Sequence, residues 1–229
     1  ADDGITLTQN DDAFFSKYSK HGYKSIKGKK VWRKTFGFNT EKKLSPDIEA
    51  TIYVFLPKLN KEYGSHPKIG RCSSGSGLSG KLRGSHHSNE SKKSAKCYIS
   101  QHEYEGGDCN NFQKEYPHSD YYKHTIKDVN PFPNWIGRTM GFKMIAINNG
   151  DKVNFFSYFD NSAVVLDDVL QTSNLWQLRY SGTDEGQFAK GKANAPFLET
   201  WGKYIEFRMD NASKDTMAFC TSVREIKRI

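Results

Sequence analysis

The sequence lacks long apolar runs, and the longest uninterrupted ones reach only about five residues. A helix that crosses a membrane needs about twenty, so we predict no membrane span. Cysteine pairs at CxxC spacing are also absent, which argues against a structural zinc site and thioredoxin-type chemistry. P-loop, dinucleotide-binding and serine-hydrolase motifs are missing as well, so the common nucleotide and esterase activities find no support.

Four cysteines are present: Cys72, Cys97, Cys109 and Cys220. An even number fits two disulfides in an exported protein, while free buried thiols are the alternative. Among the three pairings that four cysteines allow, we favour Cys72–Cys97. The chain begins at Ala1, which fits a processed export product or an engineered start. We therefore predict a secreted or cell-surface protein.

The net charge of +8 and the pI near 9.1 favour an acidic partner. The lysines are scattered, and no nucleic-acid recognition motif accompanies them. An anionic polysaccharide is therefore the predicted partner, and nucleic acid is not. No cofactor or metal ligand set is evident. A structural calcium is left open, although no dense acidic loop marks a site for it.

Residues 134–160 carry the clearest local pattern. Apolar residues alternate along residues 141–147 and again along residues 153–159, which is the signature of β-strands. Asn149-Gly150 between them is typical of a type I′ hairpin turn, since both residues tolerate positive φ. Apolar residues occur on both faces of the two strands, so we predict a central hairpin that is buried on one side and lines a groove on the other.

The rest of the chain shows short strands at turn-separated spacing. We predict strands at residues 31–38, 48–56, 68–72, 97–104, 111–116, 175–180, 204–209 and 218–226, with 204–209 and 218–226 as a closing antiparallel pair. One candidate helix covers residues 164–171, and residues 73–94 form a long polar surface loop. The pattern predicts a single all-β domain over residues 1–229, an antiparallel β-sandwich or jelly roll.

The order of several segments resembles the concanavalin A-like, laminin-G-type jelly rolls, in particular a group of uncharacterised secreted archaeal and bacterial proteins. The matching segments are residues 47–55, 112–118, 134–149, 155–160, 202–210 and 221–226. This fold class includes lectins, β-glucan hydrolases and alginate-type polysaccharide lyases. The resemblance therefore implies a sugar-facing concave sheet, and it does not say whether the sugar is cleaved.

The lyase pattern of that class is broken in this chain. SQHE resembles the lyase strand with a glutamine and a histidine two residues apart, but Gln101 and His102 are adjacent and point to opposite faces. FKMIAINN supplies the matching Lys143, yet Ile147 stands where that strand carries its catalytic tyrosine. A different catalytic arrangement would draw on His102, Tyr104, His118 or Tyr158.

Hydrolysis with retention needs two carboxylates about 5–5.5 Å apart. Glu103 and Glu105 share a strand face, but the aromatic-flanked acidic cluster of such hydrolases is missing. We interpret them as solvated strand-end side chains, so the sequence leaves open whether the protein is an enzyme.

Carbohydrate binding is therefore the leading hypothesis. Face parity within each strand selects the candidate ligand-binding residues Gln101, Glu103, Gln113, Glu115, Lys143 and Arg208, with Trp135 as the aromatic platform. Tyr104 and Tyr158 are further candidates for stacking on sugar rings. The alternatives are a polysaccharide lyase or glycoside hydrolase, and a structural cell-surface or filament subunit.

Overall fold

The computed structural model describes residues 5–9, 15–26, 29–40, 44–59, 77–84, 96–104, 111–115, 121–125, 133–167, 169–187, 195–199 and 204–228. These residues form fifteen strands joined by turns and irregular segments, and no helix occurs among them. A search of the same residues for a helix long and apolar enough to cross a membrane finds none. The secondary structure of the described chain is therefore all-β.

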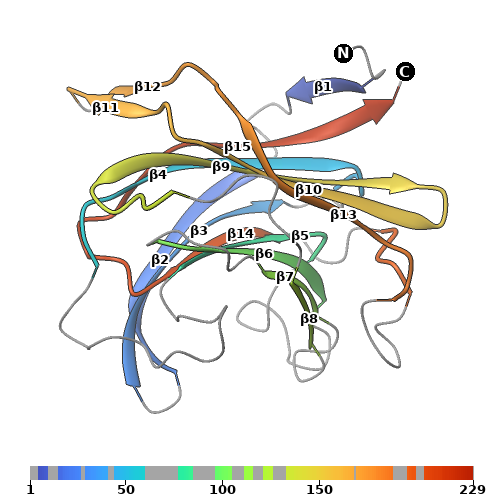
Figure 1. Cartoon of the computed structure of the whole chain (residues 1–229), viewed down its shortest axis with the longest axis horizontal. Helices are drawn as coiled ribbons and strands as arrows, with labels where there is room; N and C mark the ends of the chain where they lie inside the picture. The colour runs from blue at the N-terminus through green and yellow to red at the C-terminus, as the bar shows by residue number, and fades with distance from the viewer. Residues whose placement is uncertain are drawn as a thin grey trace.

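The strands form two large antiparallel sheets that pack face to face (Figure 1). The six-stranded sheet has the order β1 (Ile5–Gln9), β15 (Met217–Arg228), β4 (Ile48–Leu56), β9 (Arg138–Asn149), β10 (Lys152–Asp160) and β13 (Gln177–Asp184). The seven-stranded sheet has the order β2 (Phe15–Ile26), β3 (Lys29–Thr40), β14 (Tyr204–Asp210), β5 (Gly77–Leu82), β6 (Cys97–Glu103), β7 (Asn111–Glu115) and β8 (Tyr121–Thr125). A separate hairpin pairs β11 (Val164–Leu166) with β12 (Val169–Gln171).

The chain passes between the two large sheets several times, as a jelly roll does. β2 and β3 lie in one sheet, β4 lies in the other, and β5 to β8 return to the first. The predicted antiparallel β-sandwich is therefore confirmed. One predicted pairing is wrong: β14 pairs with β3 and β5, whereas β15 pairs with β1 and β4. The two C-terminal strands are neighbours in sequence but belong to opposite layers.

The central hairpin forms as the alternation predicts. β9 and β10 pair in register from Asn149 opposite Lys152 to Gly141 opposite Asp160, so the two-residue loop is Gly150-Asp151. Gly150 has a φ of 64°, a left-handed value that favours glycine. Glycine at the first loop position is the arrangement of a type II′ turn, so the turn lies one residue later than predicted and is not of type I′.

Large side chains from both sheets fill the space between them. The rings of Phe112 on β7 and Phe155 on β10 stack with centroids 3.7 Å apart. Alternate residues of β4, from Ile48 to Leu56, are buried with exposures of at most 1%. Burying apolar surface of this kind stabilises the fold by roughly 1.5–3 kcal/mol for each large side chain.

Three local predictions are wrong. Residues 73–94 are not one surface loop, because β5 lies within them, and its residues are buried at the centre of the seven-stranded sheet. The candidate helix at 164–171 is the β11–β12 hairpin. Cys97 is a free, buried thiol, which contradicts the Cys72–Cys97 disulfide. Cys72, Cys109 and the strand predicted at 68–72 lie outside the described residues.

Candidate functional site

The outer face of β6 carries two of the predicted ligand-binding residues. Tyr98 donates a hydrogen bond to Asp184 at 2.6 Å, and Ser100 Oγ lies 3.2 Å from Ser157 Oγ. Because Asp184 and Ser157 belong to the opposite sheet, Tyr98 and Ser100 point into the core. Side chains alternate along a strand. Gln101 and Glu103 therefore point away from the core, on the outer face of the seven-stranded sheet.

The same reasoning places three more predicted residues on that face. Phe112 stacks against the opposite sheet, so Gln113 and Glu115 on β7 point outward. On β14 the ring of Phe207 lies close to Gly80 of β5, where it meets Met144 of the opposite sheet. Phe207 therefore points into the core, and the next residue, Arg208, points outward. One sheet face thus brings together Gln101, Glu103, Gln113, Glu115 and Arg208 from three strands.

Gln101 and Gln113 form a cross-strand pair at the outer edge of this group. Gln113 Nε2 donates to Gln101 Oε1 at 2.8 Å, and both side chains are half-buried. Glu103 is half-buried as well, whereas Glu115 is buried and its Oε2 lies 3.6 Å from the thiol of Cys97. Gln101, Glu103 and Gln113 therefore keep part of their side-chain surface exposed on this face, whereas Glu115 does not.

Buried charges occupy the middle of the face. Lys81 Nζ donates to Glu206 Oε1 at 2.5 Å, and both side chains are almost fully buried. Asp210 lies beside Arg208 Nε at 3.1 Å and receives hydrogen bonds from Arg33 Nε and Nη2 at 2.5 and 3.1 Å. Burial alone would raise the pKa of Asp210, but Arg208 and Arg33 together hold it below its usual value.

Sequence reasoning missed most of these charged residues. Glu206 alternates with apolar residues on the same strand as Arg208, a signal that could have assigned it to the same face. Lys81 gave no such signal, because the polar residues around it favour a loop.

The seven-stranded sheet is curved, and its outer face is on the inner side of the curve (Figure 1). The described side chains on this face include slightly more carboxylates than cations: Glu103, Glu115, Glu206 and Asp210, against Arg33, Lys81 and Arg208. The excess positive charge of the chain therefore does not gather on the described part of this face.

Lys143 lies on the other side of the molecule. Phe142 next to it packs on Trp135 and His102 inside the sandwich, so Lys143 points out from the six-stranded sheet. Its Nζ lies 3.6 Å from Glu49 and 4.3 Å from the ring centroid of Trp176. Burial lowers the pKa of Lys143, and Glu49 partly opposes this. Lys143 cannot contact the same ligand as Gln101, because the sandwich separates them.

Trp135 and Tyr104 are core residues rather than stacking platforms. Both are fully buried, their rings form an edge-to-face pair with centroids 5.2 Å apart, and Trp135 Nε1 donates to the Glu103 carbonyl at 3.3 Å. Burial raises the pKa of Tyr104 well above its usual value. Neither ring is accessible to a sugar, so these two predictions are wrong.

His102 is also inside the sandwich. Its Nε2 lies 2.8 Å from Ser100 Oγ and 3.0 Å from Ser157 Oγ, and Tyr180 donates to Ser100 Oγ at 2.6 Å. The side chain is buried, so it cannot reach a surface polysaccharide as a proton acceptor. Tyr158 is half-buried on the outer face of the six-stranded sheet, opposite Lys143. His118 lies outside the described residues.

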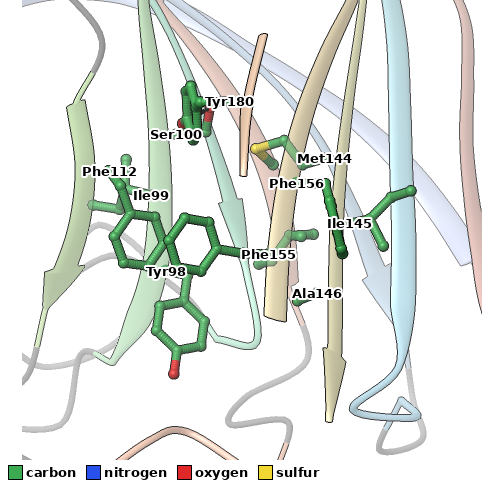
Figure 2. Close-up of a pocket in the computed structure, with 11 residues that line it drawn as sticks. Tyr98, Ile99, Ser100, Phe112, Met144, Ile145, Ala146, Phe155, Phe156 and Tyr180 are labelled. Carbon is green, nitrogen blue, oxygen red and sulfur yellow. Dashed lines mark hydrogen bonds between the residues drawn. The ribbon is translucent and has the colours of Figure 1, made fainter. Parts of the chain in front are cut away.

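Two further features bear on what the described chain could bind. A search of those residues for groups of three or more metal-ligating side chains finds none. A small void between the sheets lies among Tyr98, Phe112 and Phe155 on one side and Met144 and Ala146 on another (Figure 2). Its volume of about 20 Å³ is room for roughly one water molecule, so it is not a ligand site.

Comparison with known proteins gives weak similarities. No family model and no curated protein matches the chain. Among solved structures, the metal-free carbohydrate recognition domain of Emp46p is similar with a TM-score of 0.41 and 9% identity, over 92% of this chain and 87% of that one. A Bacillus subtilis protein of unknown function with a galectin-like fold is similar with a TM-score of 0.42 and 11% identity, over 93% and 90%. Similarities this low assign no function, so the fold rests on the sheet topology and the site on its geometry.

Proposed function

We propose that the protein binds carbohydrate on the outer face of its seven-stranded sheet. The observation that carries the proposal is the gathering of Gln101, Glu103, Gln113 and Arg208 on one curved sheet face, half-buried and within reach of a ligand. Amide groups both donate and accept hydrogen bonds, carboxylates accept and guanidinium groups donate. Such a mixture suits sugar hydroxyls, each of which can do both.

The surroundings of these side chains support a preorganised site. The Gln101–Gln113 hydrogen bond fixes two of them across neighbouring strands, and Asp210 holds Arg208. Side chains that are already held in place lose less conformational entropy when a ligand binds. Strand positions also define the spacing of the polar groups better than loop positions would.

We further propose that the preferred glycan is acidic, because the chain carries a net charge of +8. Since carboxylates slightly outnumber cations on the described part of the face, the attraction would come from the wider surface rather than from direct ion pairs. Long-range attraction is screened by salt. Binding of an acidic glycan should therefore weaken as ionic strength rises, while binding of a neutral glycan should not.

A glycan array probed at low and high ionic strength tests the proposal. Gln113→Ala should weaken binding of the captured glycan by about tenfold, the effect of losing one well-made hydrogen-bonding group. Gln177→Ala on β13 of the other sheet is the matched control and should leave binding unchanged. No binding to any glycan, or equal losses in the two variants, would contradict the proposed face.

The two other classes of function make different predictions. A lyase or hydrolase would release unsaturated or reducing ends from polysaccharide, but two of the four candidate catalytic residues, His102 and Tyr104, are buried in the core. A structural subunit would assemble with rising protein concentration in the absence of glycan. Export remains a prediction from the sequence.

A further inference from the structure

Most of the exposed large apolar side chains lie on one hairpin or line the cleft beside it. Val164, Leu166 and Val169 belong to β11 and β12 and are 48–59% exposed, and Leu175 and Met217 are 60% and 41% exposed. Among the residues whose side chains the structure describes, no other large apolar side chain is exposed. Apolar patches on a protein surface commonly mark interaction sites.

The hairpin is a small unit outside the two main sheets. It has three residues in each strand, and Leu166 lies opposite Val169. It projects over the outer face of the six-stranded sheet, on the side away from the proposed glycan face (Figure 1). A two-stranded hairpin this short is marginally stable by itself, and apolar side chains that stay exposed to water do not stabilise it. We therefore look for a ligand that these side chains could contact.

A cleft of about 550 Å³ lies between the hairpin and the six-stranded sheet. Its lining includes Phe55 of β4, Met140 of β9, Met217 of β15 and the hairpin residues Val164 to Leu166. This volume is within the range of small-molecule sites, which are mostly apolar with a few polar groups. The cleft thus has the size and the composition to take a small apolar molecule.

One positive charge lies in this apolar lining. Arg138 at the start of β9 is exposed, and it is the one charged residue that lines the cleft. It makes no ion pair with any residue that the structure describes, and no carboxylate lines the cleft. Thr139 and Asn161 add two neutral polar groups. A guanidinium group with open donors complements a carboxylate, which it can bind through two parallel hydrogen bonds.

We propose that this cleft binds a small amphipathic carboxylate, a molecule with a flexible saturated chain and a terminal carboxylate, and that Arg138 binds the carboxylate. The apolar chain would lie along Phe55, Met217 and Leu166. This second site is on the opposite outer face from the proposed glycan site and does not depend on it.

Isothermal titration calorimetry of the full chain with decanoate tests the proposal. Decanol, which has the same chain length and no charge, is the comparison ligand. Decanoate should bind more tightly than decanol by about tenfold or more, as expected for one charge-assisted bidentate contact. Arg138→Gln should remove that preference and leave decanol binding unchanged. Leu166→Ser should weaken both ligands, and Lys227→Gln, at the far end of β15, should affect neither.

Three results would overturn the proposal. The first is equal binding of decanoate and decanol, or a preference that survives in Arg138→Gln. The second is a fall in the sedimentation mass of the ligand-free protein in Leu166→Ser, because the hairpin would then be an interface between two copies of the chain. The third is binding to anionic lipid vesicles without binding to dispersed decanoate, which would make the hairpin a membrane contact. Near-UV circular dichroism shows that each variant is folded.

Discussion

Lys81 and Glu206 form an ion pair at 2.5 Å on the outer face of the seven-stranded sheet, and their side chains are 1% and 4% exposed. They belong to β5 and β14, which are adjacent in the sheet although 125 residues separate the pair in sequence. Burial lowers the pKa of Lys81, and Glu206 opposes that effect. The pair therefore joins two neighbouring strands on the same sheet face as the proposed glycan-binding residues.

Removing one partner of this pair should be strongly destabilising. Lys81→Met removes the cation that lies 2.5 Å from the buried Glu206 carboxylate, so the free energy of unfolding should fall by about 3–5 kcal/mol. The double variant Lys81→Met/Glu206→Leu removes both charges and should recover much of that loss. Urea unfolding of the two variants measures the difference. A double variant as unstable as the single one would show that packing, and not the uncompensated charge, sets the cost.

Asp160 should make part of the stability depend on pH. Its carboxylate accepts hydrogen bonds from the Ser162 hydroxyl at 2.5 Å and the Ser162 amide at 2.9 Å, from Thr172 at 2.6 Å, and from Tyr53 at 3.0 Å. Burial alone would raise the pKa of Asp160, but these bonds hold it below its usual value. Because the folded pKa is below the unfolded one, the stabilisation is complete above the unfolded value of about 4 and is lost as the pH falls through the folded value.

Asp160→Asn tests this dependence. At neutral pH the variant should be less stable than the wild type by about 1–3 kcal/mol, because an amide cannot accept all of these bonds and leaves one donor unpaired. The difference should narrow as the pH falls below about 4. Thermal unfolding across a pH series measures it, and a difference that is constant with pH would contradict the role assigned to the charged carboxylate.

The alternation of apolar residues was enough to predict some strands and their faces. The bounds of β4 and the pairing of β9 with β10 follow from it, as does the shared face of Gln101 and Glu103. Alternation fixes which side of a strand is buried because side chains point to opposite faces. It is therefore informative wherever one face of a strand meets the core.

Alternation does not say which sheet a strand joins. Lys143 and Gln101 both face away from the core, but their strands lie in opposite layers. The residues that were predicted to line one groove therefore lie on two opposite faces of the molecule. Trp135 shows a second limit: an aromatic ring serves equally well in a core or on a surface, and the covering strands decide between them. Strand β5 was missed because its glycines, serine and lysine resemble a loop until the neighbouring strands bury them.

Gly141 on β9 leaves room for a cluster of side chains on the outer face of the six-stranded sheet. A Cβ atom at this position would lie 2.6 Å from Tyr53 Cε1 and 3.0 Å from Trp176 Cη2. Gly141→Ala should therefore displace these rings and destabilise the fold by about 1–3 kcal/mol. Ser181→Ala, at an exposed position of β13, is the control and should change stability little. Equal unfolding midpoints for Gly141→Ala and the wild type in urea would contradict the close packing of this cluster.

The thiol of Cys97 should be protected from chemical modification in the folded protein. Burial raises its pKa well above the usual value, and the neighbouring Glu115 raises it further, so the reactive thiolate is scarce. Iodoacetamide labelling followed by peptide mass mapping should find the Cys97 peptide labelled at least about tenfold more slowly in native protein than in denatured protein, since labelling requires local opening. The same map, made without reduction, should show Cys97 unlinked. A peptide that joins Cys72 to Cys97, or rapid native labelling, would show that Cys97 is not the buried free thiol on β6 that lies against Glu115.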